Sequence, residues 1–108
     1  TISNLLMSTD KGDTWSKTTD DIGYDVIFDV EVDPTSGSLF LAMRDRGIVR
    51  AMVKKGKAAL ETLSKLPSGD IPQHLALDPK NPETMYTFSK AHMLYKSVDG
   101  GKNWQKIL

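Results

Sequence analysis

Short apolar runs alternate along the chain with clusters of Gly, Pro, Asp, Asn and Ser, and this pattern predicts β-strands. The segment VIFDVEV at 26–32 alternates apolar and polar positions, while LFLAM at 39–43 is a compact apolar run. Asp-Pro, Ser-Gly and Asp-Gly pairs between such runs are typical turn sequences. We therefore predict strands at 3–8, 14–18, 26–32, 38–43, 47–53, 58–63, 72–77, 84–89, 92–97 and 103–107.

Two octapeptides near the ends of the chain share the pattern Ser-x-Asp-x-Gly-x-x-Trp. They are STDKGDTW at 8–15 and SVDGGKNW at 97–104, and their glycines, Gly12 and Gly101, lie 89 residues apart. This spacing is about twice 44 or 45, which predicts a third copy near residue 56, where Gly56 stands. In this degenerate copy the Ser, Asp and Trp are replaced by Ala51, Val53 and Ala59.

A second marker repeats with the same interval. The segments VEVDPTSGSLFLAM and LALDPKNPETMYTF align, and their Asp33 and Asp78 lie 45 residues apart. A period of about 45 is in the range of propeller blades and of some helical repeats. KAALETLSKL is ambiguous, because it contains good helix formers with Leu60 and Leu63 at helical spacing. The repeat places this segment at the fourth strand of a unit, so we predict a strand at 58–63.

The octapeptide predicts a hairpin turn. Gly12 can take a positive φ that other residues adopt poorly, and the Asp10 carboxylate can accept hydrogen bonds from the amides of its own turn. Ser8 can add a further local hydrogen bond, and Trp15 is expected to bury about 150–250 Å² by packing over the strands. Because each residue has a structural task, and Trp104 the same task in the second copy, the motif requires no catalytic role.

These residues resemble the Asp-box, or BNR repeat, of β-propeller proteins, including bacterial xyloglucanase-like, photosystem II assembly factor-like and sortilin-like propellers. The first copy matches at Ser8, Asp10, Gly12, Thr14 and Trp15. The second copy matches at Ser97, Asp99, Gly101 and Trp104, with Asn103 in place of the usual Thr. The resemblance implies an all-β fold built from four-stranded antiparallel blades.

The resemblance divides the chain into about two and a half blades. Residues 1–20 would form the C-terminal half of a blade with its Asp-box, 21–66 a full blade with the degenerate copy, and 67–108 a full blade with an Asp-box. Propellers close with about four to eight blades. We therefore expect the chain to be part of a larger propeller or to assemble with copies of itself.

Two functions follow from the resemblance. The first is a non-catalytic propeller segment that acts as a binding or scaffold surface for a glycan or a protein. The alternative is a fragment of a xyloglucanase- or sialidase-like glycoside hydrolase whose catalytic residues lie largely outside this chain. The weak candidates for glycosidase carboxylates here are Asp25, Asp29 and Asp45. Asp29 interrupts an apolar alternation, where burial would raise its pKa, but all three also fit water-facing positions at strand ends, and no catalytic residue is assigned.

The other polar and aromatic residues favour structural roles. Arg44, Arg46 and Arg50 are interpreted as solvated strand-end charges rather than as a sialidase arginine cluster. His74 and His92 lack partners at metal-ligand spacing, so no metal is expected, and no cofactor either. The KKGK run at 54–57 is interpreted as a solvated hairpin tip. Tyr24 is the best candidate for stacking on a sugar, and the remaining aromatic candidates are Phe28, Tyr86, Phe88 and Tyr95.

Composition restricts the classes of binding partner that the chain is expected to have. The 108 residues carry a formal net charge of zero and have no basic stripe, which argues against nucleic-acid binding. No apolar run approaches the roughly 18 residues of a membrane span, and the first residues lack the pattern of a signal peptide. The absence of cysteine excludes disulfides and thiolate metal sites. The compartment is unknown from composition, and the family resemblance favours an extracytoplasmic location, secreted or periplasmic.

Overall fold

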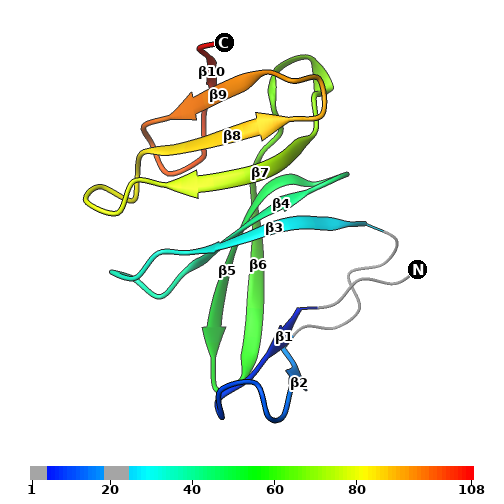
Figure 1. Cartoon of the computed structure of the whole chain (residues 1–108), viewed down its shortest axis with the longest axis vertical. Coiled ribbons are helices and arrows are strands. Elements are labelled where there is room, and N and C mark those ends of the chain that lie inside the picture. The colour runs from blue at the N-terminus through cyan, green and yellow to red at the C-terminus, as the bar shows by residue number, and fades with distance from the viewer. Residues whose placement is uncertain (1–4, 19–24) are drawn as a thin grey trace.

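The structure is a computed structural model that describes residues 5–18 and 25–108 (Figure 1). The chain is all-β, as the alternating pattern predicts, and the strands form three separate antiparallel sheets. The N-terminal sheet contains β1 (Leu6–Met7) and β2 (Ser16–Lys17). The central sheet contains β3 (Ile27–Val32), β4 (Leu39–Met43), β5 (Gly47–Lys54) and β6 (Lys57–Ser64). The C-terminal sheet contains β7 (Pro72–Leu77), β8 (Met85–Ser89), β9 (Leu94–Ser97) and β10 (Gln105–Lys106).

Both four-stranded sheets are simple meanders in which each strand pairs with its neighbour in sequence. Their orders are β3-β4-β5-β6 and β7-β8-β9-β10. The sheets are joined by a short 3-10 turn at Pro67–Gly69. In Figure 1 the C-terminal sheet lies beside β3 and β4, and the N-terminal hairpin lies near the far ends of β5 and β6. The ambiguous segment is a strand, so the prediction at 58–63 is confirmed.

Several predicted strands are shorter than expected, and the larger differences have identifiable reasons. The strand predicted at 92–97 begins at Leu94, because His92 has a φ of 63° and belongs to the preceding turn. The strands predicted at 14–18 and 103–107 begin at Ser16 and Gln105, because the motif loop continues through its tryptophan. Of the strand predicted at 3–8, only β1 forms among the described residues.

The predicted third copy of the motif is a different kind of turn. Lys54 pairs with Lys57, so the β5–β6 hairpin turns over Lys55 and Gly56 alone. Their φ values are 52° and 75°, and two positive φ values in a two-residue hairpin loop are the property of a type I′ turn. Gly56 therefore forms a hairpin turn at the expected position. Without the Ser and Asp of the motif, the loop is shorter and the β5–β6 pairing extends to Lys54 and Lys57.

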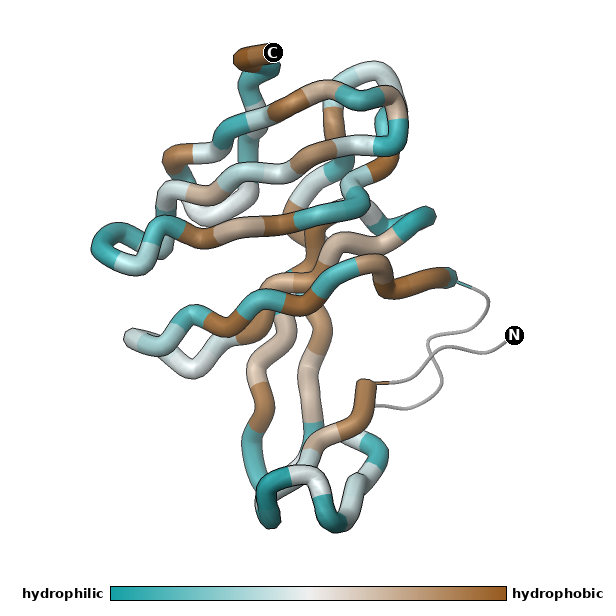
Figure 2. Tube along the Cα trace, in the orientation of Figure 1, coloured by the Kyte–Doolittle hydropathy of each residue, from teal (hydrophilic) through white to brown (hydrophobic). Residues whose placement is uncertain are grey.

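The central sheet contributes to two hydrophobic cores, one with each neighbouring sheet. One core joins the N-terminal sheet and consists of Leu5, Leu41, Met43, Val49 and Ala51. The other joins the C-terminal sheet and consists of Phe40, Ala42, Ile48, Leu75 and Met85. Figure 2 shows hydrophobic residues along the strands at the centre and hydrophilic residues at the hairpin tips. Alternation along β4 thus supplies both cores at once, because successive side chains point to opposite faces.

The packing prediction holds for one tryptophan and is wrong for the other. Trp104 is half-buried and packs against the core shared by the central and C-terminal sheets. Trp15 is 61% exposed. The two tryptophans differ because Trp104 packs at the interface with the complete four-stranded sheet that precedes its own sheet. The described residues contain no such sheet before β1.

Among the described residues there is no helix of the length and apolarity needed to cross a bilayer.

Candidate functional site

The two motif hairpins form the same hydrogen-bonded loop. In the first, Ser8 Oγ donates to Asp10 Oδ1 at 2.8 Å and accepts from the Gly12 amide at 2.8 Å. In the second, Ser97 Oγ donates to Asp99 Oδ1 at 2.8 Å and accepts from the Gly101 amide at 2.9 Å. The glycines have φ values of 93° and 90°, as predicted, where an L side chain would be strained.

The aspartate of each loop accepts hydrogen bonds from the residue four positions later. Asp10 Oδ1 accepts from the Thr14 amide at 2.8 Å, and Asp10 Oδ2 accepts from the Thr14 hydroxyl. Asp99 accepts from the Asn103 amide at 2.9 Å and from Asn103 Nδ2 at 2.7 Å. Asparagine therefore replaces threonine without loss of a hydrogen bond, because both side chains can donate to the second carboxylate oxygen.

These hydrogen bonds lower the pKa of both carboxyl groups. The pKa of Asp10 falls from 3.8 to about 2, mainly because the Thr14 hydroxyl and then the Thr14 amide donate to the charged form. The pKa of Asp99 also falls to about 2, mainly through the side chain and the amide of Asn103. Carboxylates stabilised in this way stay ionised near neutral pH and are poor general acids. The motif carboxylate thus stabilises the conformation of its own loop, which is the structural role that the sequence suggests.

The second hairpin is also fastened to the sheet before it. Trp104 Nε1 donates to Ser64 Oγ at 2.9 Å and to the Gly101 carbonyl at 3.2 Å, and Ser64 Oγ donates to the same carbonyl. Ser64 is the last residue of β6, so this cluster joins the central and C-terminal sheets. In the first hairpin the corresponding Trp15 Nε1 donates to its own loop, at the Gly12 carbonyl, at 3.0 Å.

A second aspartate repeats in the two large sheets, and in each sheet it binds the turn between the second and third strands. Asp25 is buried, accepts from the amides of Val26, Asp45 and Arg46 at 2.7–3.1 Å, and forms an ion pair with Arg46 at 3.3 Å. Its carboxylate therefore fastens the β4–β5 turn to the start of β3. This arrangement occupies the acceptor positions that a glycosidase acid or base would need.

Asp70 is the counterpart of Asp25 in the C-terminal sheet. It accepts from the amides of Ile71 at 2.8 Å and Ala91 at 3.3 Å, and from the Tyr95 hydroxyl at 3.0 Å. Sequence reasoning missed this pair, although a signal was present. Asp25 and Asp70 are 45 residues apart, and each stands eight residues before the aspartate of an Asp-Pro pair.

Asp29 connects the first strands of the two large sheets. Its Oδ2 accepts the Leu75 amide of β7 at 2.7 Å, and its Oδ1 accepts the following amide, Val30, at 2.9 Å. The interruption of the apolar alternation in β3 thus has a structural explanation, because the carboxylate satisfies an amide across the interface. No pair of free carboxylates facing a common cleft arises from Asp25 and Asp29.

Asp45 and the arginines lie at the surface. Asp45 forms a two-bonded pair with Arg44, with both distances 3.1 Å, and this contact lowers the pKa of the Asp45 carboxyl. Arg50 forms an ion pair with Glu61 at 2.9 Å across β5 and β6. Arg44 pairs with Asp45 of the β4–β5 turn, Arg46 pairs with Asp25 before β3, and Arg50 lies in mid-strand, so the three do not converge on one binding point.

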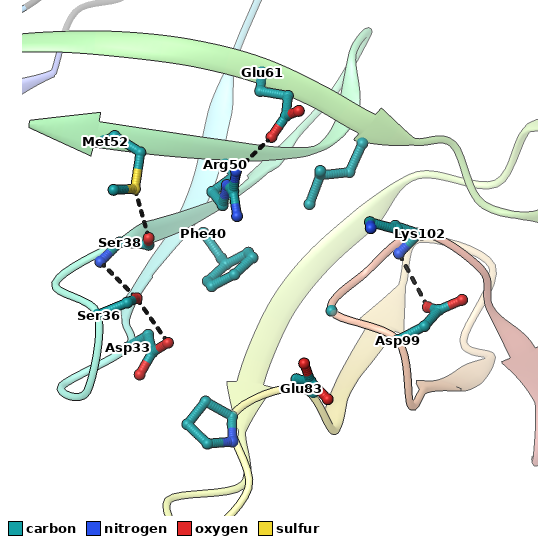
Figure 3. Close-up of a pocket in the computed structure, with 13 residues that line it drawn as sticks. Asp33, Ser36, Ser38, Phe40, Arg50, Met52, Glu61, Glu83, Asp99 and Lys102 are labelled. Carbon is teal, nitrogen blue, oxygen red and sulfur yellow. Dashed lines mark hydrogen bonds and ion pairs between the residues drawn. The ribbon is translucent and has the colours of Figure 1, made fainter.

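A groove of about 360 Å³ lies between the central and C-terminal sheets beside the second motif (Figure 3). Its walls combine charges of both signs, including the Arg50–Glu61 pair, Glu83, and the loop of Asp99 and Lys102. The Phe40 ring is among its lining residues but is almost fully buried. The groove therefore presents a polar surface between two sheets, with four acidic and two basic lining residues, and its lining offers no exposed aromatic ring for a sugar.

The remaining candidates are dispersed. Tyr95 is buried, and burial together with its hydrogen bond to Asp70 raises the pKa of its hydroxyl. Phe88 is exposed and lies 6.3 Å from the ring of His92, while Tyr86 lies beneath the Lys96 ammonium. Phe28 is exposed on β3, and His74 is exposed on β7. Tyr24 lies outside the described residues.

Within residues 5–18 and 25–108, no three His, Cys, Asp or Glu side chains are arranged to hold a metal ion. Comparison of the sequence with known protein families and with curated proteins finds no match. The Asp-box resemblance therefore remains a prediction carried by the motif residues themselves.

Proposed function

We propose that this chain is a non-catalytic module of Asp-box propeller blades that provides a binding or scaffold surface. The observation that carries the proposal is the fastening of one sheet to the next by the motif itself. Trp104 and Gly101 of the second hairpin meet Ser64 of the preceding sheet, above a core to which both sheets contribute. A unit that contains its own means of attachment to the previous unit is suited to building an array.

The proposed binding surface is the charged groove between the sheets, with a glycan or a protein as partner. Its mixture of Arg50, Glu61, Glu83 and Lys102 suits a polar ligand. The glycoside hydrolase alternative depends on Asp25, Asp29 and Asp45. The carboxylates of Asp25 and Asp29 accept hydrogen bonds from backbone amides, and the carboxylate of Asp45 is paired with Arg44. These contacts favour the non-catalytic hypothesis.

A glycan array combined with a hydrolysis assay tests this proposal. The purified chain is applied to the array and, separately, incubated with xyloglucan and with a sialylated oligosaccharide. We expect no product from either substrate, and any array signal should weaken in a Glu83→Lys variant, which reverses one charge of the groove. Release of sugar by the wild-type chain, lost on substitution of Asp25, Asp29 or Asp45, would overturn the non-catalytic assignment.

A further inference from the structure

The N-terminal hairpin is equivalent to the last hairpin of the C-terminal sheet, but among the described residues its sheet has two strands instead of four. Met7 pairs with Ser16 in the first hairpin as Lys96 pairs with Gln105 in the second, again at a spacing of 89 residues. In the C-terminal sheet β9 lies between β8 and β10. Among the described residues β1 pairs only with β2, so its other edge is open.

The backbone groups at this open edge belong to Leu6. The Thr18 amide donates to the Leu5 carbonyl at 2.9 Å, which makes Leu5 and Thr18 a hydrogen-bonded pair. Hydrogen-bonded and non-hydrogen-bonded pairs alternate along an antiparallel ladder. The Leu6–Lys17 pair is therefore of the second kind, and the N–H and C=O of Leu6 point away from β2, toward the position that β8 occupies beside β9.

An apolar groove of about 350 Å³ lies beside this edge. It is lined mainly by Leu5, Leu6, Trp15, Val30, Leu39 and Val53. The groove is continuous with the core that joins the N-terminal and central sheets, because Leu5 belongs to both and Leu39 packs against that core. An apolar surface that extends an existing sheet–sheet interface is suited to a further segment of the same kind.

Equivalent positions show what covers such a surface. Val30 of β3 is opposite Leu41, and Leu75 of β7 is opposite Thr87, at matching places in their sheets. Leu75 is 4% exposed because the central sheet covers it, with the Asp29 carboxylate of β3 on its amide. Val30 is 38% exposed. The segment that covers β7 is thus the β3–β4 hairpin, and within residues 5–18 and 25–108 no segment of this kind lies over β3.

We infer that the open edge of β1 and the adjoining apolar groove form a docking site for a β-hairpin. The second strand of this hairpin pairs antiparallel with β1 through the N–H and C=O of Leu6, and its apolar face covers Val30 and Leu39. This inference rests on the proposed stacking of sheets for its geometry. The recognition is strand addition, in which backbone hydrogen bonds supply affinity and alternate side chains supply specificity.

A synthetic peptide with the sequence of residues 26–43 is the probe, because this hairpin covers β7 in the interface that serves as the template. The labelled peptide is titrated with the full chain and followed by fluorescence anisotropy. We expect saturable binding of one peptide per chain. Leu6→Pro removes the amide at the open edge but no β1–β2 hydrogen bond, and Val30→Asp puts a charge in the groove. Each change should weaken binding at least tenfold.

Two controls isolate the site. Phe88→Asp makes a comparable change on an exposed apolar residue of the C-terminal sheet, away from the groove, and should leave peptide affinity unchanged. A peptide carrying Phe40→Asp should bind at least tenfold more weakly, because Phe40 is the larger of the two β4 residues in the core that β4 shares with β7. Circular dichroism checks that each chain variant is folded.

The inference is overturned if the peptide does not bind the folded wild-type chain, or if folded Val30→Asp and Leu6→Pro bind it as tightly as wild type. It is also overturned if light scattering shows a dimer that both substitutions dissociate while the peptide fails to bind, because a second copy would then fill the groove. Failure of the peptide leaves the array and hydrolysis results untouched, so this test and that of the proposed function are separable.

Discussion

The hairpins at 8–15 and 97–104 have the same loop and different surroundings. Both contain the serine, aspartate and glycine hydrogen bonds at nearly equal distances, although Trp15 is largely exposed and Trp104 is packed between two sheets. The loop is therefore a local structure that forms from its own residues. The burial of its tryptophan depends on the sheet that precedes the hairpin, and among the described residues a complete four-stranded sheet precedes the second hairpin alone.

Truncation of the two tryptophans should show the largest difference between the two hairpins. Trp104→Ala removes core packing between two sheets and should lower the free energy of unfolding by about 3 kcal/mol, the lower end of the range for large aromatic residues. Trp15→Ala should lower it by less than about 1 kcal/mol, because the ring is mostly in water. Urea unfolding of both variants measures the difference, and equal losses would contradict the contrast in packing.

Alanine at the two motif glycines should give a smaller contrast. Both substitutions force an L residue to a φ near 90°. A Cβ at Gly101 would also lie 3.2–3.3 Å from Met85, Ile48 and Leu63, whereas at Gly12 its nearest neighbour is Trp15 at 3.8 Å. We expect Gly101→Ala to cost about 2 kcal/mol and Gly12→Ala about 1 kcal/mol, with overpacking as the difference. Urea midpoints in which Gly12→Ala is the more damaging change would refute this assignment.

The hydroxyl that joins the sheets can be removed without disturbing the loop. Ser64→Ala deletes the hydrogen bonds from Trp104 Nε1 and to the Gly101 carbonyl, while Trp104 Nε1 keeps its bond to that carbonyl. We expect a loss of about 1 kcal/mol in thermal or urea unfolding, the usual net value for a hydrogen bond. Ser16→Ala, which removes a long and exposed contact of 3.4 Å, is the matched control and should be nearly neutral. A neutral Ser64→Ala would show that apolar packing alone holds the sheets together.

The sequence predicts local features well because their causes are local. Alternation and turn residues predict the strands, and the motif serine and aspartate predict the local hydrogen bonds of the loop. The exposure of Trp15 was not predictable, because it depends on which sheet lies beside the hairpin. The structural roles of Asp25 and Asp29 were also hidden, because each carboxylate binds amides 20 or more residues away.

Acid should affect both hairpins alike, and this is the smallest effect because both carboxylates are solvent-exposed. The folded pKa of Asp10 and of Asp99 is about 2, below the ordinary value of 3.8. A lowered folded pKa gives stability that is complete above the unfolded pKa and is lost as the pH falls from about 4 to 2. Asp10→Asn and Asp99→Asn should each reduce the loss of stability over this interval. Carboxyl-carbon NMR titration measures the two pKa values directly. A value near 3.8 for Asp10 alone would mean that the first loop depends on a neighbouring sheet after all.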